Sequence, residues 1–220
     1  MTQPLLPQRP AGLGDQVANE LRRQIITQSL QTGVLLVEEK LATDFGVSRG
    51  PIRDAIRILT QEGLVISTGR SASVVGLSAA DIDELFTLRA SLELLALRVA
   101  LGEHADELDQ NLARSLAAMT RAAETGDTAA FTRADVQFHS SFYAASHHRR
   151  LSDVWSQYQP TIENLLLVAN LEHTGLPLAL QSHVYLAGLI QTRAFQPASI
   201  ELESHLDRSR LRVRREYAGG

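Results

Sequence analysis

The chain has 220 residues, 44% of them hydrophobic, which is enough for one large domain or two small domains with apolar cores. It contains no cysteine, so disulfides and thiolate chemistry are excluded and any metal site must use histidine and carboxylate side chains. A formal net charge of −4 argues against a protein that coats nucleic acids non-specifically, but it is compatible with a DNA reader whose positive charge is local.

The first 13 residues contain three prolines and no long apolar run. We expect residues 1–13 to form a disordered tail rather than an export signal. Elsewhere the apolar runs are short and interrupted by charged residues, so we expect no membrane span and a bacterial cytoplasmic protein.

Residues 14–76 have the pattern of three short helices followed by a β-hairpin. The helices are expected at 14–29, 37–45 and 48–62, and the strands at 64–67 and 71–75. Gly46 is expected to end the second helix, because glycine tolerates the left-handed C-terminal position. Ser48 is expected to begin the third, because its hydroxyl can cap free N–H groups. Two short helices joined by a tight turn and followed by a hairpin predict a winged helix-turn-helix domain.

The third helix combines a basic face with an apolar one. Arg49 and Arg53 are four residues apart and share the exposed face. In a winged helix-turn-helix this helix enters the major groove, where Arg49 can donate twice to guanine and Ser48 can bond a phosphate. Arg70, at the hairpin tip, can reach a phosphate or the minor groove. The alternative is a solvated basic face, since residues 15–77 hold seven basic and seven acidic residues.

Residues 77–218 have an almost entirely helical pattern. Helices are expected at 79–101, 105–125, 127–146, 151–170, 177–193 and 197–217. Ser78 caps the first, and Gly126 is a clear break between two others. The pattern predicts a mainly α chain, with an antiparallel bundle of six or seven helices behind the winged helix-turn-helix.

Four residues of the predicted bundle have the chemistry of a metal site. Asp135 and His139 are four residues apart on one helix, and His183 and His205 lie inside the last two helices with apolar neighbours. A carboxylate and three imidazoles that meet in a bundle core would bind a divalent transition metal. The alternative for each histidine is a hydrogen-bonded core residue.

Other polar residues are candidates for a ligand pocket. Arg89 and Glu93 are four residues apart in the first helix of the bundle, which is also the spacing of an ordinary intrahelical ion pair. Tyr143, Asn164 and Tyr185 are candidate polar contacts for an effector, with packing or surface positions as the alternative.

Residues 14–75 resemble the winged-helix domain of GntR-type bacterial regulators. The resemblance is carried by Leu41-Ala42, Phe45-Gly46-Val47-Ser48-Arg49, Pro51-Ile52-Arg53-Asp54-Ala55-Ile56, Leu59 and Glu62-Gly63-Leu64-Val65. It implies that Ser48, Arg49, Pro51 and Arg53 contact DNA, with the wing near Arg70. This chain departs from the family where a basic residue often holds phosphate, because that position is Glu39; the adjacent Lys40 replaces the contact in part.

Residues 79–217 resemble the FCD-type sensor domain found behind GntR winged helices. Its metal pattern is an aspartate, a histidine four residues later and one histidine in each of the last two helices. Asp135, His139, His183 and His205 fit this pattern, whereas Ser182 stands where the family usually has an acidic residue. The resemblance implies a divalent metal, with zinc expected and nickel or manganese as alternatives. It also implies that Arg89 pairs with the carboxylate of an organic acid.

These features together predict a sequence-specific transcriptional regulator, not an enzyme. We expect a repressor that binds a palindromic operator as a homodimer and is relieved by a small carboxylate bound near the metal. One alternative is a metal-dependent hydrolase, with Glu163, Glu201 and Glu203 as candidate bases by position only. The other is a metal-free dimerising DNA-binding protein whose histidines hydrogen-bond one another.

Overall fold

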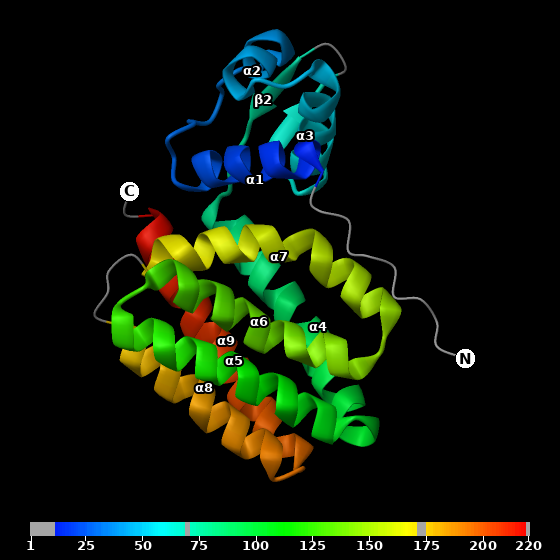
Figure 1. Cartoon of the computed structure of the whole chain (residues 1–220), viewed down its shortest axis with the longest axis vertical. Helices are drawn as coiled ribbons and strands as arrows, with labels where there is room; N and C mark the ends of the chain where they lie inside the picture. Colours follow the sequence, from blue (N-terminus) through cyan, green and yellow to red (C-terminus); the bar gives the residue numbers. More distant parts are fainter. Residues whose placement is uncertain (1–11, 69–70, 171–174, 219–220) are drawn as a thin grey trace. The chain divides into compact units, whose positions relative to one another are not determined.

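The computed structural model describes residues 12–68, 71–170 and 175–218. The chain divides into two compact units, Met1–Leu77 and Ser78–Gly220, and Figure 1 labels most of their elements. The predicted tail lies outside the described residues up to residue 11. Among the residues described, none of the helices combines the length and the apolar character that a membrane span needs.

The first unit is a winged helix-turn-helix, as the sequence predicts. Its elements are α1 (Leu13–Ile26), α2 (Glu38–Phe45), α3 (Arg49–Gln61), β1 (Val65–Ser67) and β2 (Ala72–Val74). The strands pair antiparallel, with Val65 opposite Val74 and Ser67 opposite Ala72. A bridge between Leu35 and Ser73 extends the hairpin, and the sequence pattern did not predict it.

An apolar core and one buried ion pair hold α3 against α1. Ile52, Ala55 and Leu59 of α3 are fully buried in a cluster to which α1 also contributes. The Arg22 guanidinium donates to both Glu62 carboxylate oxygens, from Nε at 2.6 Å and from Nη2 at 2.5 Å. Because both side chains are at most 6% exposed, this two-point contact fixes the end of α3 relative to α1.

The second unit is a helical bundle, again as predicted. Its described residues form α4 (Ala79–Glu103), α5 (Ala105–Thr125), α6 (Thr128–Ser146), α7 (Arg149–Asn170), α8 (Leu176–Gln191) and α9 (Phe195–Ala218). Helix α6 packs against α4, α5 and α7, and α9 packs against α4, α7 and α8. Figure 1 shows α6 running through the bundle, which places its side chains in the interior.

The ends of the bundle helices follow local capping chemistry. The Ser78 hydroxyl accepts a hydrogen bond from the Asp81 N–H at 3.2 Å, and the Asp127 carboxylate accepts one from the Ala130 N–H at 2.8 Å. Gly126 ends α5 with φ of 69°, a left-handed conformation that glycine adopts without a Cβ penalty. These caps set the start of α4 and the start of α6, the two helices that carry the buried polar residues described next.

Candidate functional site

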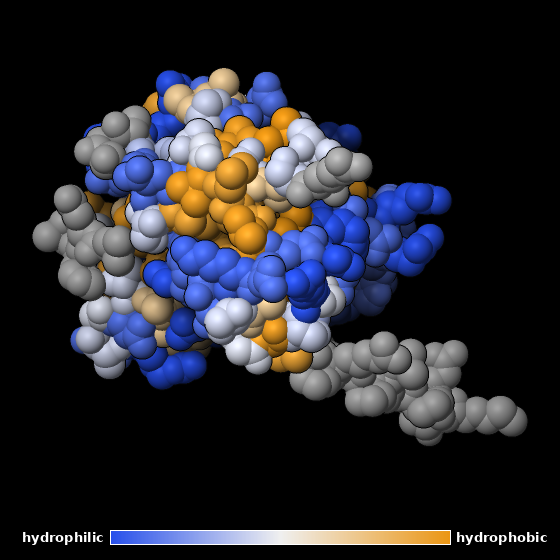
Figure 2. Space-filling view, turned by 90° about the horizontal axis from the view of Figure 1, so that it is seen from above, coloured by the Kyte–Doolittle hydropathy of each residue, from blue (hydrophilic) through white to orange (hydrophobic). Residues whose placement is uncertain are grey.

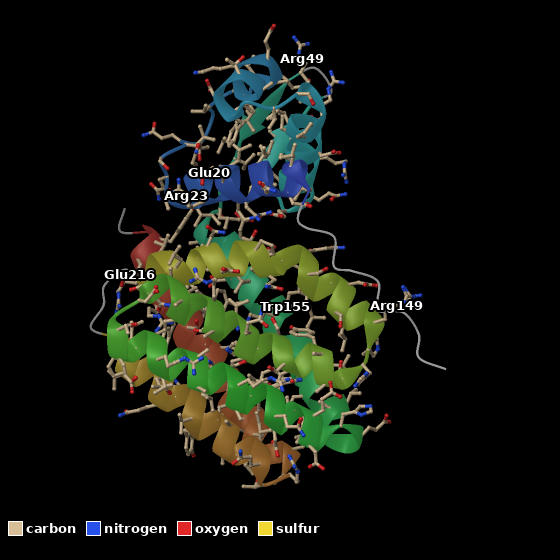
Figure 3. All side chains as sticks on the ribbon, viewed as in Figure 1. Glu20, Arg23, Arg49, Arg149, Trp155 and Glu216 are labelled. Carbon is tan, nitrogen blue, oxygen red and sulfur yellow. The ribbon has the colours of Figure 1, made fainter. Side chains whose placement is uncertain are left out.

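The N-terminus of α3 presents two arginines to solvent. The side chains of Arg49 and Arg53 are 55% and 66% exposed. Figure 3 shows Arg49 projecting away from the ribbon at the start of the helix. Ser48 occupies the N-cap position, but its hydroxyl makes no capping hydrogen bond to the helix as described. Pro51 lies in the first turn, where its missing N–H costs little.

Two glutamates of α2 hold these arginines in place. Arg49 Nη2 lies 3.1 Å from Glu39 Oε1, and Arg53 Nε donates to Glu38 Oε2 at 2.8 Å. Exposed pairs of this kind are worth only about 0.2–1 kcal/mol, so a DNA phosphate or guanine can replace the glutamates at small cost. The sequence reasoning missed both pairs. Lys40 is exposed on α2, and Arg70 lies outside the described residues.

Apolar side chains are exposed in the same unit. Leu35 and Val37 are 63% and 53% exposed, and they line a groove of about 420 Å³ together with Glu38 and Arg53. Figure 2 shows apolar surface bordered by hydrophilic side chains. The groove therefore combines exposed apolar side chains with the paired charges of Glu38 and Arg53.

The four predicted metal ligands meet inside the bundle. Asp135 and His139 of α6, His183 of α8 and His205 of α9 are all at most 7% exposed. Asp135 Oδ1 lies 3.6 Å from His139 Nε2 and 3.4 Å from His183 Nε2. One ring nitrogen from each histidine lies within 4.8 Å of those of the other two. The structure thus brings together side chains from three helices, as the metal pattern requires.

The opposite nitrogen of each ring is anchored. His139 Nδ1 lies 2.6 Å from Glu93 Oε2, His183 Nδ1 donates to the Ala179 carbonyl at 2.7 Å, and His205 Nδ1 lies 2.9 Å from Ser182 Oγ. Such outer contacts orient imidazoles and leave the other nitrogen for a metal. The sequence did not predict that Glu93 contacts a metal-site histidine. Its four-residue spacing from Arg89 was the sequence feature that singled Glu93 out.

The electrostatics of the cluster suit a metal cation. Burial alone would raise the pKa of Asp135, but His183, His139 and Arg89 bring it below its ordinary value, so the carboxylate is ionised. Burial lowers the pKa of His205 well below its ordinary value and also lowers that of His139. An ionised carboxylate at Asp135 and neutral rings at His139 and His205 are protonation states that suit metal binding.

One orphaned atom tests whether the residues present fit a metal. His183 Nε2 is buried and has no hydrogen-bond partner among the described residues. A buried polar atom without a partner costs about 1–3 kcal/mol, and a bound cation would remove that cost. The donor set of three imidazoles and one carboxylate matches zinc and its neighbours, and it leaves room for a further ligand if the ion is five- or six-coordinate.

Arg89 and Tyr143, two of the predicted effector contacts, lie beside this cluster. Arg89 is 3% exposed and its Nε donates to Glu93 Oε1 at 2.6 Å, so the pair is a buried contact rather than a solvated one. Arg89 Nη2 and the Tyr143 hydroxyl are buried without a described partner. Tyr143 stacks on Trp155 with ring centroids 4.9 Å apart, and Figure 3 shows where Trp155 leaves α7.

The other two predicted effector residues are placed differently. Asn164 donates to the Pro160 carbonyl of its own helix at 2.8 Å. Tyr185 is 58% exposed on α8. It follows the buried His183 by two positions, which is about 200° around a helix, so the two side chains face opposite ways. The structure therefore does not bring Tyr185 to the cluster.

A basic cavity adjoins the cluster between α8 and α9. It has a volume of about 460 Å³, and its lining includes Asp135, His183, His205, Arg208, Arg212 and Arg215. Arg212 Nε is buried without a described partner, and burial lowers the pKa of this guanidinium. Arg208 is held by Glu201 at 2.7 Å. An anion in this cavity would meet arginine on one side and the histidine cluster on the other.

Comparison with known proteins gives two family matches and several relatives. Residues 13–75 match the family model for bacterial regulatory proteins of the gntR family, and residues 84–208 match that of the FCD domain. The gluconate operon transcriptional repressors of Bacillus licheniformis and Bacillus subtilis are 32% and 30% identical over 72% of this chain. Each match covers 65% of the relative's length, so this chain spans about two thirds of those proteins.

A solved structure shows the same fold. The Escherichia coli protein McbR matches with a TM-score of 0.75 and 20% identity, over 94% of this chain and all of that chain.

Proposed function

The chain belongs to the GntR family of bacterial regulatory proteins and carries an FCD domain, and from this premise we propose that it is a transcriptional repressor controlled by a sugar acid bound beside a metal. The proposal is carried by the presence of two features in one chain. Two exposed arginines stand at the start of α3, and the bundle contains a buried cluster of Asp135, His139, His183 and His205. The relatives named above are regulators and not enzymes, so the hydrolase alternative has no support.

In the proposed DNA complex, α3 lies in the major groove. Arg49 reads a guanine through its two donors, Arg53 and Ser48 contact phosphates or neighbouring bases, and Pro51 brings the backbone close to the DNA. Lys40 supplies a phosphate contact from α2, and Arg70 one from the wing. Two copies of the chain read a palindromic operator, because one reading helix covers only a half-site.

In the proposed sensor, Asp135, His139, His183 and His205 would hold a divalent ion, with zinc expected before nickel or manganese. When bound, the ion supplies a positive centre for an effector carboxylate. Arg89 and Tyr143 lie next to the cluster with unpartnered polar atoms, which supports their role as further effector contacts. On the α8–α9 side, Arg212 contributes a further buried donor.

The relatives suggest the class of effector. Two of them are named as repressors of a gluconate operon, which makes gluconate and related sugar acids the first candidates. Such a ligand has a carboxylate for the metal and hydroxyl groups for hydrogen bonds to side chains such as Tyr143. It relieves repression only if it favours a protein conformation that binds the operator less tightly.

Operator selection followed by an effector titration tests this proposal. Genomic fragments that bind the full-length protein are selected and sequenced, and the enriched site is labelled for fluorescence anisotropy. We expect gluconate or a related sugar acid to release the site from metal-loaded protein and to have a weaker effect after chelation. Absence of any sequence preference would reject the DNA-reading role. Release that is identical with and without metal would reject the metal's part in effector binding.

A further inference from the structure

A second group of metal-binding side chains lies on the surface, where α4 meets α5 and α6 ends. His104 joins α4 to α5, Glu107 lies in the first turn of α5, and His147 directly follows α6. His147 Nε2 lies 2.8 Å from Glu107 Oε2, and the His104 and His147 ring centroids are 4.3 Å apart. One ligand atom of each of the three residues lies within 4.8 Å of those of the other two.

We propose that His104, Glu107 and His147 form a second divalent metal site, which takes Zn²⁺ through two imidazoles and one carboxylate. Zinc bonds to nitrogen and oxygen are about 2.0–2.2 Å long, so tetrahedral ligand atoms lie roughly 3.4 Å apart. The ligand atoms of the three side chains lie within 4.8 Å of one another, and His147 Nε2 lies 2.8 Å from Glu107 Oε2, so side-chain rotation would bring them to this spacing. Solvent water takes the fourth position, because the site is open.

The local charges favour a cation on balance. Helices α4 and α6 both end here, and their C-terminal carbonyls carry partial negative charge. The N-terminus of α5 opposes this, but Glu107 brings a full negative charge and Glu103 Oε2 lies 3.8 Å from His104 Nε2. Asp106 is engaged by Arg193 at 2.9 Å and is not counted among the ligands.

The backbone of His147 is left-handed, as it also is at Gln28 and Arg193, two other residues that follow helices. Its φ of 49° lies in the left-handed region, where Gly126 ends α5 in the equivalent position after its helix. A residue with a Cβ costs about 1–2 kcal/mol in this conformation, and glycine avoids that cost. A glycine at position 147 would therefore stabilise this helix end.

This outer site is separate from the buried cluster. His104, Glu107 and His147 are 36%, 45% and 54% exposed, so an ion there exchanges with solvent and binds more weakly than one in the bundle. It would tie the start of α5 to the end of α6, the helix that also carries Asp135 and His139. The inference stands on its own residues and does not depend on the proposed repressor function.

The number of zinc ions bound per chain tests the proposed outer site. Full-length protein without a histidine tag is stripped by chelator, dialysed against Zn²⁺ and analysed for bound zinc. We expect two ions per chain for the parent, one for His147→Gly and one for His205→Gln, which keeps only the outer site. His147→Gly folds at least as stably without metal, because it relieves the left-handed backbone. His148→Gln, a neighbouring histidine outside the group, is the matched control and retains two ions.

The variants separate the two sites. Another outcome is a parent that holds a single ion. If His147→Gly removes that ion and His205→Gln does not, the result supports the outer site and rejects metal binding by the buried cluster. If His147→Gly and Glu107→Gln both bind as much zinc as the parent, the outer site is rejected whatever the buried cluster does.

Discussion

His139 Nδ1 lies 2.6 Å from Glu93 Oε2, although the two residues are 46 positions apart and belong to α6 and α4. The other Glu93 oxygen accepts a hydrogen bond from Arg89 Nε at 2.6 Å. Because a carboxylate can only accept, the His139 Nδ1–H must donate, and its Nε2 lone pair is turned toward Asp135. Helix α4 thus orients His139, a residue of the proposed metal site that α4 does not itself carry.

Glu93→Gln is expected to weaken metal binding by about 10- to 100-fold, the usual cost of losing the outer partner of a metal-bound histidine. Competition with a chelating dye measures the affinity. Glu84→Gln, an exposed change on the same helix, is the control and should leave the affinity as it is. If Glu93→Gln binds the metal as tightly as the parent, the contact between Glu93 and His139 does not contribute to metal affinity.

Removing the metal is expected to destabilise the bundle. A ligand present at 100 times its dissociation constant stabilises the folded state by about 2.7 kcal/mol. Thermal unfolding of His147→Gly, which lacks the outer site, should shift to lower temperature with chelator. Adding His205→Gln should abolish most of that shift. A chelator effect of equal size in both proteins would place the responsible ion elsewhere.

The metal-free protein is expected to lose stability in mild acid. Burial lowers the pKa of His205 and of His139 below the ordinary 6.5, so both rings stay neutral in the folded state. The unfolded chain takes up these protons as the pH falls through about 6.5, so the free energy of unfolding decreases between about pH 7 and pH 5. Denaturant melts across that range should show the slope, and His205→Gln should make it shallower. A flat profile for the parent would contradict the neutral rings.

Arg49→Ala is expected to cost about 1–3 kcal/mol of operator affinity and to relax the preference at one guanine. Anisotropy titrations on the selected site and on single-base variants measure both effects. Arg23→Ala, which removes an exposed arginine of α1 (Figure 3), should change the affinity much less. Equal losses on every base variant would instead assign Arg49 to a phosphate.

Glu39→Gln is expected to tighten DNA binding by a few-fold. The substitution frees Arg49 from its 3.1 Å ion pair and removes a negative charge beside the proposed DNA-reading arginine, which would otherwise repel phosphates. Affinity measured at several salt concentrations should show the largest gain at low salt. Glu20→Gln, which breaks the comparable Arg23 pair on α1, is the control. A weaker complex would mean that Glu39 orients Arg49 productively.

Most of the fold could be predicted because its signals are local. Ser78, Gly126 and Gly46 mark helix ends by capping chemistry alone, and the structure places ends at these residues. The Leu35–Ser73 bridge was missed because pairing between segments distant in sequence leaves no periodic trace. The start of α7 at Arg149 was missed by two residues, within the usual uncertainty of helix ends.

The site was predictable only in part. The spacing of Asp135 and His139 implies one shared face, but nothing in their spacing could bring His183 and His205 to the same point; the family resemblance supplied that. Glu93 was seen only as the partner of Arg89, because its contact with His139 depends on how α4 packs on α6. Helical geometry alone indicates that Tyr185 and His183 face opposite sides of α8, as the structure shows.

The hydroxyl of Ser182 differs from the partners of the other two rings. The Ala179 carbonyl and the Glu93 carboxylate can only accept, whereas Ser182 Oγ can donate to His205 Nδ1 or accept from it. Ser182 Oγ also accepts from Arg208 Nη2 at 3.0 Å, and Arg208 lines the basic cavity. An anion that draws Arg208 away would remove one donor from the Ser182 hydroxyl and would thereby alter its hydrogen bond to His205. If the proposed metal and an anion in the cavity both bind, this contact would link them thermodynamically, and each would alter the affinity of the other by the same factor.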